Sequence, residues 1–375
     1  MTSSLPLLAA APLVAGLLSA PTTGATATWQ TATAFGQRAV KTLVAPFIPE
    51  ITPEVTPITL KVAPEAVPMA GALSAQEKGS ASGMPDVVEH ATAPTASERE
   101  RVLGYWTPRR MASALPIDRL AKVTGVLRRL SAAGQGVAPR RSPHGTVSRT
   151  AGARWTSGGA VGRTTGRVFL TIKGSDFVCS ASSVRSASKD LVVTAGHCVK
   201  DGTGAWADNW TFVPGYSQGR RPYGQYTARR MFVAGPWSRE GDDSHDIGMV
   251  AVNTSGGRHL GDVVGGQDIA FGAPRGRPAS GFGFPADTPY DGEHLVYCAG
   301  PLRDDPNGQT GDQGMRCDMT AGSSGGPWLS GFDASTGKGT IVSVSSFKYS
   351  DDRHTMYGPY FGDSARTLYT TASAS

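Results

Sequence analysis

The sequence predicts an all-β domain over residues 166–375, and three observations support this prediction. The chain contains 48 glycines and 26 prolines, which favour turns and interrupt long helices. From residue 167 onward, short runs of β-branched and apolar residues alternate with Gly, Asp and Pro turns. No segment of about 20–50 residues repeats, which argues against a solenoid. Many short strands of this kind are typical of a β-sandwich or a pair of β-barrels.

About eleven segments of this domain have the composition of a short strand, rich in β-branched and apolar residues and bounded by turn residues. In chain order they cover residues 167–172, 176–184, 191–198, 211–216, 229–234, 246–252, 268–272, 280–284, 294–299, 327–332 and 340–347. Apolar residues make up 39% of the chain, which is enough to build a sizeable core around these strands.

Residues 1–28 have the features of a signal peptide, which predicts a secreted protein. A short apolar stretch leads to small residues and an A-x-A pattern at 25–27, which is typical of a cleavage site. The positive start of such a signal is missing, because no Lys or Arg precedes Arg38. No later segment is long and apolar enough to cross a membrane, so no membrane partner is expected.

Residues 29–165 predict a propeptide or linker region that is mostly disordered. Segment 44–68 carries six prolines and little periodicity, which favours an extended chain. In residues 115–133, apolar residues recur at near-helical spacing and predict one short amphipathic helix. Residues 134–166 are rich in Gly, Ser and Arg and predict a linker, in which Arg140–Arg141 is a candidate cleavage site.

The net charge of +6 does not belong to the predicted β domain. Residues 1–165 carry 17 Lys and Arg against 9 Asp and Glu, whereas residues 166–375 carry 19 against 21. The basic excess therefore lies in the predicted linker region. We expect no nucleic-acid partner on this ground.

All four cysteines lie in the predicted β domain. An even number of cysteines in an exported protein predicts two disulfides. The close C-x-x-C spacing of a zinc site is absent, and no loop of spaced carboxylates indicates calcium, so we expect no metal and no cofactor. The cysteines are Cys179, Cys198, Cys298 and Cys317.

Three short segments carry residues suited to nucleophilic catalysis. Residues 194–198 read TAGHC, residues 245–250 read HDIGMV, and residues 322–327 read GSSGGP. The first follows an apolar strand, the second opens one, and the third is a glycine-rich loop before one. The three together, in the order His, Asp, Ser, are a stronger signal than any of them alone.

The chemistry of acyl transfer explains why these residue types are needed. A serine hydroxyl becomes a nucleophile when a base accepts its proton, and histidine can both take and return that proton. We predict Ser324 as the nucleophile, His197 as the base and Asp246 as the carboxylate that orients it. The backbone N–H groups of Gly322 and Ser324 are the natural donors to an oxyanion, because Gly322 has no side chain to block the approach.

Two other functions remain as alternatives. GSSGG also fits the G-x-S-x-G elbow of α/β-hydrolases, which would make the protein an esterase. That order requires an acid and a histidine after the serine, and among the 51 residues after Ser324 the only histidine is His354. A catalytically silent homologue that binds proteins is the other alternative, although such a protein typically loses one of the three residues.

The three motifs resemble those of the trypsin/chymotrypsin-like serine peptidases. TAGHC resembles the family's TAAHC, HDIGMV its D-I-A-L acid strand, and GSSGGP its G-D-S-G-G-P; the bacterial secreted members and the glutamyl-endopeptidase-like branch look most similar. The resemblance covers residues 166–375. It implies two six-stranded antiparallel β-barrels packed face to face, with the site in the cleft between them.

The resemblance also implies further roles. Cys179 and Cys198 match the family's disulfide beside the histidine loop, and we expect Cys298 to pair with Cys317. The family's activity implies a serine endopeptidase that acts on protein or peptide substrates. We expect a monomer, with its own N-terminal segment as a propeptide.

The sequence departs from the trypsin pattern at two places. Ser323 stands where trypsins carry the Asp that receives the new N-terminal ammonium, so activation of a zymogen must differ here. Asp318 lies six residues before Ser324, where trypsins place the acid that selects Arg or Lys. Asp318 is therefore a candidate substrate-binding residue, and a structural acid is the alternative. The strand 340–347 offers only serines where glutamyl-type relatives place a substrate-binding histidine.

Overall fold

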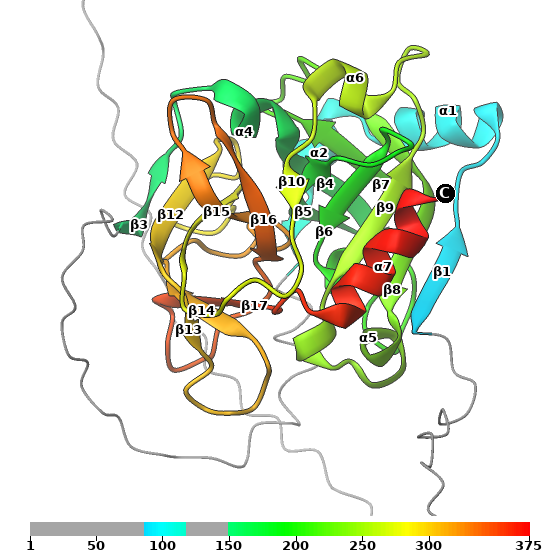
Figure 1. The fold of residues 1–375 in the computed structure, drawn as a ribbon. Helices are drawn as coiled ribbons and strands as arrows, with labels where there is room; N and C mark the ends of the chain where they lie inside the picture. Colours follow the sequence, from blue (N-terminus) through cyan, green and yellow to red (C-terminus); the bar gives the residue numbers. More distant parts are fainter. Residues whose placement is uncertain (1–85, 118–148) are drawn as a thin grey trace, which may run out of the picture. The chain divides into compact units, whose positions relative to one another are not determined.

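The computed structural model describes residues 86–117 and 149–375 (Figure 1). The predicted signal peptide, the proline-rich segment 44–68 and the Arg140–Arg141 pair lie outside the described residues. Most of the helix predicted over 115–133 also lies outside them. At its start the structure has a strand instead, β2 (Leu115–Pro116), because these residues pair with a strand of the β domain.

Six antiparallel strands form a closed barrel in the first half of the β domain. Each strand pairs with the next, and the last pairs with the first. In pairing order they are β4 (Thr165–Ile172), β5 (Ser175–Val184), β6 (Leu191–Thr194), β9 (Gly248–Val252), β8 (Tyr226–Ala234) and β7 (Asp208–Pro214). The prediction of an all-β fold is therefore confirmed, with one closed six-stranded barrel.

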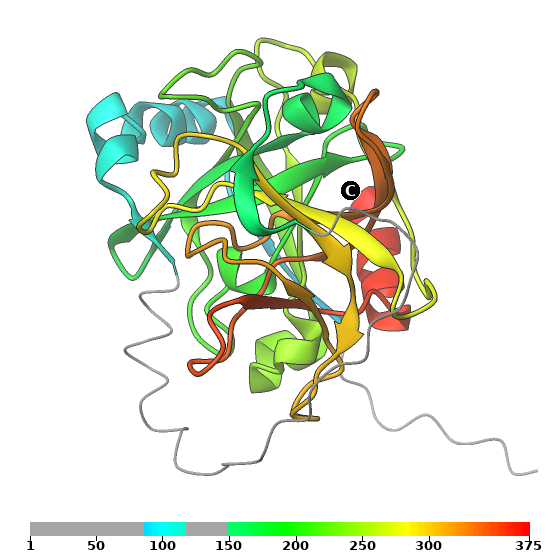
Figure 2. The same ribbon diagram turned by 90° about the vertical axis from the view of Figure 1, so that its left-hand side faces the viewer.

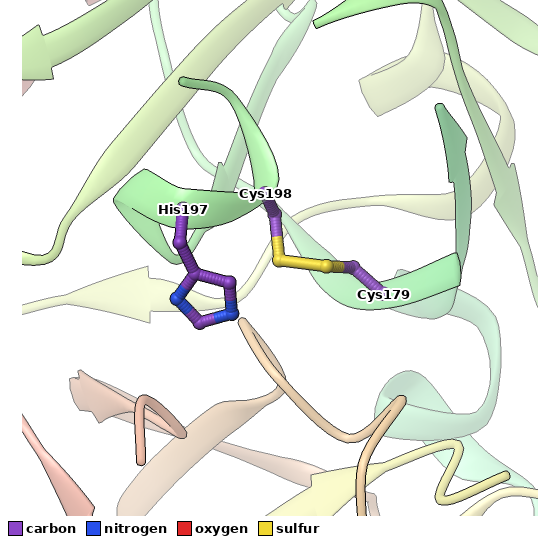
Figure 3. Close-up of side chains that lie close together, drawn as sticks. All are labelled: Cys179, His197 and Cys198. Carbon is purple, nitrogen blue, oxygen red and sulfur yellow. A yellow bond between two sulfur atoms is a disulfide. The ribbon is translucent and has the colours of Figure 1, made fainter. Parts of the chain in front are cut away.

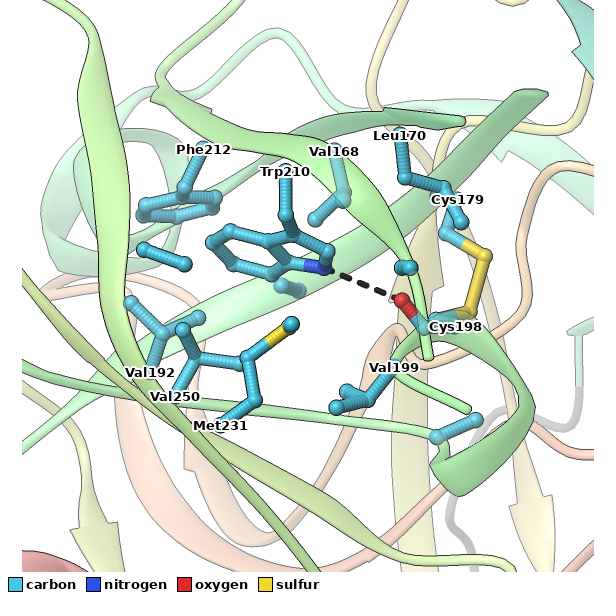
Figure 4. Packing of buried hydrophobic residues seen from close by; sticks show 14 of the residues in the cluster. Val168, Leu170, Cys179, Val192, Cys198, Val199, Trp210, Phe212, Met231 and Val250 are labelled. Atoms are coloured by element: carbon cyan, nitrogen blue, oxygen red, sulfur yellow. Dashed lines mark hydrogen bonds between the residues drawn. A yellow bond between two sulfur atoms is a disulfide. The ribbon is translucent and has the colours of Figure 1, made fainter. Parts of the chain in front are cut away.

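The interior of this barrel is packed around Trp210, which is 2% exposed (Figure 4). Val168, Phe212 and Val250 are among the apolar side chains that surround it. A buried indole needs a partner for its N–H, and Trp210 Nε1 donates to the Cys198 carbonyl at 3.0 Å. The barrel core thereby holds the turn that carries His197.

The second half of the β domain contains a mostly antiparallel sheet of six strands and a separate sheet of three strands. In pairing order the larger sheet contains β10 (Asp268–Ile269), β16 (Lys338–Val344), β15 (Pro327–Asp333), β11 (Pro278–Gly283), β12 (Val296–Pro301) and β3 (Arg149–Arg154). The smaller sheet contains β13 (Arg303–Asp304), β14 (Gln313–Arg316) and β17 (Thr355–Gly358). The second predicted barrel is not confirmed, because the strand pairs of the described residues leave β10 and β3 as edges of the larger sheet.

Short helices connect and cover the strands. They are α4 (Gly159–Thr164), α5 (Gly235–Glu240), α6 (Leu260–Val264) and the C-terminal α7 (Asp363–Ser373). Helix α7 lies across β8 and β9 (Figure 1) and buries Ala365, Leu368 and Ala372, which repeat at helical spacing. Among the described residues, none of the helices has the length and apolar character needed to cross a membrane.

The sequence predicted a mostly irregular chain over residues 29–165, but residues 149–165 contain β3 and α4, and regular structure also forms in residues 86–117. They contain β1 (Val87–Ala91), α1 (Ala96–Tyr105), α2 (Pro108–Ser113) and β2, drawn in blue and cyan (Figure 2). Strand β1 pairs with β8 and extends the sheet of the barrel, whereas β2 runs parallel to β5. Helix α1 begins at a capping box, in which Thr95 and Glu98 satisfy each other's backbone N–H groups.

Candidate active site

His197 lies on a 3-10 turn, Gly196–Cys198, directly after β6. The disulfide between Cys179 and Cys198 ties this turn to β5 (Figure 3). The second disulfide joins Cys298 and Cys317. The pairing that the family resemblance implied and the expected pairing of Cys298 with Cys317 are therefore both present, and the first fixes the histidine turn against the neighbouring strand.

Asp246 accepts hydrogen bonds from both the ring and the backbone of His197. His197 Nδ1 lies 2.7 Å from Asp246 Oδ2, and the His197 N–H donates to Oδ1 at 2.7 Å. Because a carboxylate accepts, this contact places the ring hydrogen on Nδ1 and turns Nε2 away from the acid. Gly196 allows the close approach, since a Cβ at this position would lie 2.9 Å from Asp246 Oδ1.

A third donor to Asp246 was not singled out from the sequence. Ser346 Oγ donates to Asp246 Oδ2 at 2.5 Å. The Asp246 carboxyl is almost fully buried, which by itself raises its pKa, but the nearby His197 and the hydrogen bonds from His197 and Ser346 outweigh burial and lower the pKa. Asp246 is therefore an ionised carboxylate at neutral pH, held in one orientation.

The Ser324 backbone is fixed beside the histidine turn. Its carbonyl oxygen accepts from the Ser180 N–H at 2.8 Å and lies 3.6 Å from Cys198 Sγ. The next residue, Gly325, has a φ of +79°, and a Cβ there would lie 2.7 Å from the Ala195 nitrogen. The glycine is therefore what allows this loop to reach the residues before His197.

Gly322 and Ser323 determine the path of the loop before Ser324. Gly322 has a φ of +93°, and a Cβ there would lie 2.8 Å from the Phe284 carbonyl oxygen. Its own carbonyl accepts from Ser180 Oγ at 2.9 Å, so its orientation is fixed. Within the described chain, the Gly322 N–H donates to no protein acceptor that would compete with a ligand. Ser323 turns inward, and its hydroxyl donates to the Thr320 carbonyl at 2.6 Å.

Asp318 is occupied by contacts with β3 and with Tyr290. Its Oδ1 accepts from the Gly152 N–H at 2.7 Å and from the Tyr290 hydroxyl at 2.6 Å. Its backbone N–H donates to the Thr150 carbonyl at 3.1 Å. These contacts are those of an acid that holds β3 in place.

Another histidine–aspartate pair in which the acid is buried lies away from these motifs. His259 Nδ1 lies 2.5 Å from Asp190 Oδ2, and Asp190 Oδ1 accepts from the Leu260 N–H at 2.9 Å. This pair could not be predicted from the sequence, because Asp190 and His259 are 69 residues apart and neither lies in a motif.

One group in the described residues has the composition of a metal site, namely Cys179, His197 and Cys198 (Figure 3). Its two sulfur atoms are bonded to each other, so neither is a thiolate that could bind an ion. The group therefore does not fit a metal, and the histidine lies beside a disulfide instead.

Comparisons with known proteins agree with this arrangement. The protease Anisep of Arthrobacter nicotinovorans is 43% identical, with a TM-score of 0.55 over 57% of this chain and 96% of its own. The thermostable serine protease AL20 of an extremophilic microorganism is 39% identical, with a TM-score of 0.55 over 58% of this chain and 99% of its own. No family model matches the sequence.

A curated protein, the extracellular metalloprotease of Bacillus subtilis (strain 168), is 33% identical over 101 residues. These residues are 27% of this chain, which spans only 32% of that protein. The two structural relatives, by contrast, are matched over almost their whole length. On the strength of that coverage and identity, together with the three motifs, the chain belongs to the trypsin/chymotrypsin-like serine peptidases.

Proposed function

We propose that the protein is a secreted serine endopeptidase that cleaves peptide bonds through Ser324, His197 and Asp246. The observation that carries this proposal is the juxtaposition of two features. Asp246 fixes the His197 ring so that Nε2 points away from the acid. The Ser324 carbonyl is held against β5 and the disulfide of the same histidine turn.

The proposed reaction has two half-reactions. Ser324 Oγ attacks the carbonyl carbon of the peptide bond while His197 Nε2 takes its proton, and the imidazolium is stabilised by Asp246. The N–H groups of Gly322 and Ser324 hold the oxyanion of the tetrahedral intermediate. His197 then gives the proton to the leaving amine as the C–N bond breaks, which leaves an acyl-enzyme. Water repeats these steps to release the acid and restore Ser324.

Secretion, domain limits and activation belong to the same proposal. Residues 1–28 serve as a signal peptide, residues 29–165 as a propeptide region, and residues 166–375 as the peptidase domain, to which residues 149–165 add β3 and α4. In this proposal, the larger and smaller sheets of the second half correspond to the family's second barrel. The matched part of the chain, 57–58%, is smaller than the described part, which supports an N-terminal region additional to the peptidase.

Substrate preference depends on the role of Asp318. Its bonds to Gly152 and Tyr290 support a structural acid over a residue that selects Arg or Lys. A peptide-library digest by the wild type and by Asp318→Asn tests this. We expect no preference for Arg or Lys, and a variant with unchanged sequence preference and a lower Tm. A preference for Arg or Lys that disappears in the variant would assign Asp318 to the substrate pocket instead.

Labelling with an organophosphonate probe tests the nucleophile. We expect the wild type to be labelled and Ser324→Ala to be unlabelled. Ser335→Ala, which changes a serine in the exposed turn after β15, is the matched control and should be labelled like the wild type. Labelling that persists in Ser324→Ala would end the assignment.

A further inference from the structure

Residues 86–117 share a hydrophobic core with the barrel. Trp106 is 1% exposed and packs on Phe169 of β4, with ring centroids 5.5 Å apart. Met111 and Ala114 of this segment belong to the same buried cluster, together with Val178 of β5. Removal of the segment would expose this apolar surface, so the barrel and the segment stabilise each other.

Hydrogen bonds along the whole segment support the packing. Strand β1 pairs with β8 over five residues, from Val87 with Ala234 to Ala91 with Arg230. Further along, Asn253 Nδ2 donates to the Ala93 carbonyl at 3.0 Å. Such an interface, with a strand added to a sheet edge and a buried indole, resembles one between two subunits.

The end of the segment lies beside the proposed nucleophile. On β5, backbone groups of alternate residues point to the same edge. Val178 accepts from the Ile117 N–H at 3.4 Å, and two residues further the Ser180 N–H donates to the Ser324 carbonyl. At a strand rise of about 3.3 Å per residue, Ile117 and Ser324 occupy neighbouring places on this edge, roughly 7 Å apart.

The same edge is one that an extended peptide could use. Peptides commonly bind to a sheet by adding a strand to an open edge, through backbone hydrogen bonds. Strand β2 already pairs there, with Leu115 opposite Phe177 and Pro116 opposite Val178. A substrate that continues past Ser324 along β5 would meet these residues.

We propose that residues 86–117 form a bound inhibitory segment, and that the barrel surface around β5 and β8 is the interface that retains it. The segment stays attached to residues 149–375 after the chain between them is cut. Its residues 115–117 cover the edge of β5, so that extended substrates must displace them. The inhibitory part rests on the proposed function, since it requires Ser324 to be the nucleophile.

Retention is tested with the full chain carrying Ser324→Ala, which prevents self-digestion. The recognition sequence of a specific protease replaces Arg140–Arg141, and the cut protein is passed over a size-exclusion column. We expect the N-terminal piece to elute with residues 149–375 in native buffer and to separate in denaturant. Separation in native buffer would overturn the proposal, whatever the catalytic residues are.

Inhibition is tested with the cut two-chain enzyme and two substrates. One is an ester with a small leaving group, and the other is a peptide with several residues on both sides of the cleaved bond. Ile117→Pro removes the N–H that bonds to Val178, and we expect it to raise kcat/KM about tenfold for the peptide and to leave the ester unchanged. Leu103→Ala, which alters an exposed side chain of α1 in the same segment, is the control and should change neither.

The outcomes separate the two proposals. An equal change for both substrates, or no change for the peptide, would overturn the inhibitory role. If Ile117→Pro lowers Tm, replacement of residues 115–117 by Gly-Ser-Gly gives the same comparison with residues 86–114 still docked. Loss of organophosphonate labelling in every form would instead overturn the proposed function, and the inhibitory role with it.

Discussion

Of the four histidine–aspartate pairs among the described residues, the two whose aspartate is buried have nearly the same local geometry. In one, His197 Nδ1 lies 2.7 Å from Asp246, and in the other, His259 Nδ1 lies 2.5 Å from Asp190. Both aspartates are buried, at 1% and 4% exposure. In each pair the second carboxylate oxygen accepts a backbone N–H, from His197 itself or from Leu260.

The surroundings of the two pairs differ. Asp246 has a third donor in Ser346, and the loop of Ser324 lies against the His197 turn. The His259 side chain is 49% exposed, compared with 20% for His197. Asp190 instead bonds to the first residue of α6 and so stabilises the start of a short helix. A histidine–aspartate contact is therefore not evidence of catalysis by itself; what matters is the group that faces the other side of the ring.

Replacement of the two histidines should give the largest contrast. For His197→Ala we expect kcat/KM on a peptide to fall by about 10⁵–10⁶, because the serine loses its base. His259→Ala should stay within about twofold of the wild type, because its pair stabilises the fold only. Steady-state kinetics measures both, with Tm as a control for folding. A large loss of activity in a folded His259→Ala variant would remove the distinction between the pairs.

Replacement of the two aspartates should give a smaller contrast of the same kind. Asp246→Asn can no longer fix the ring tautomer, and we expect a loss of roughly 10⁴ in kcat. Asp190→Asn should keep kcat within about twofold but lower the free energy of unfolding by about 1–3 kcal/mol, since a buried hydrogen-bond pair is weakened. Kinetics and denaturant unfolding of each variant check this. Similar kinetic losses in the two variants would contradict it.

The residues of the proposed site that lie in local motifs were predictable from the sequence. His197 and Ser324 each lie next to a glycine or a cysteine whose local role is direct, and Asp246 opens an apolar strand two residues before Gly248. Gly196 admits the carboxylate of Asp246 to the histidine turn, for example. Ser346 was not predictable, because Ser343, Ser345 and Ser346 follow one another on one strand segment. Which of them reaches Asp246 depends on the path of the chain at the end of β16.

The fold was predictable to a similar extent. All eleven predicted strand segments contain a strand, because each combines β-branched or aromatic residues with turn residues near its ends. The structure of residues 86–117 was missed, although Thr95 and Glu98 form a capping-box pattern that marks the start of α1. Strand β1 has no such signal, since its five residues become a strand by pairing with β8.

Ser346→Ala should have a smaller effect than changes to the pairs themselves. The variant removes one of the donors to Asp246 but leaves both bonds to His197, so we expect kcat to fall about tenfold. Because the lost bond lowers the pKa of Asp246, the acidic limb of the pH profile should also move to higher pH. Ser343→Ala, three residues earlier in β16, is the control. A profile that does not move would mean that Ser346 contributes to packing alone.

A second buried carboxyl group, Asp312, is influenced by the charge of Asp246. Its side chain is buried, and no partner is found for either carboxylate oxygen among the described residues. Burial first, and then the charge of Asp246, raise the pKa of Asp312 to about 8. The folded protein therefore binds one proton more than the unfolded chain between about pH 4 and pH 8, and this lowers stability as pH rises through that window.

Replacement of Asp312 by Asn should change the free energy of unfolding by an amount that depends on pH. At pH 4, close to the ordinary pKa of 3.8, Asp312 is neutral in the folded protein and only about half ionised in the unfolded chain, so Asp312→Asn and the wild type should unfold at similar denaturant concentrations. Near pH 8 the variant should be more stable by up to a few kcal/mol, because the wild type must keep a buried acid protonated or accept its charge beside Asp246. Denaturant unfolding at pH 4, 6 and 8 measures the difference. A difference that does not change with pH would mean that Asp312 has the same pKa in the folded protein and in the unfolded chain. The charge of Asp246 would then have no measurable effect on the ionisation of Asp312.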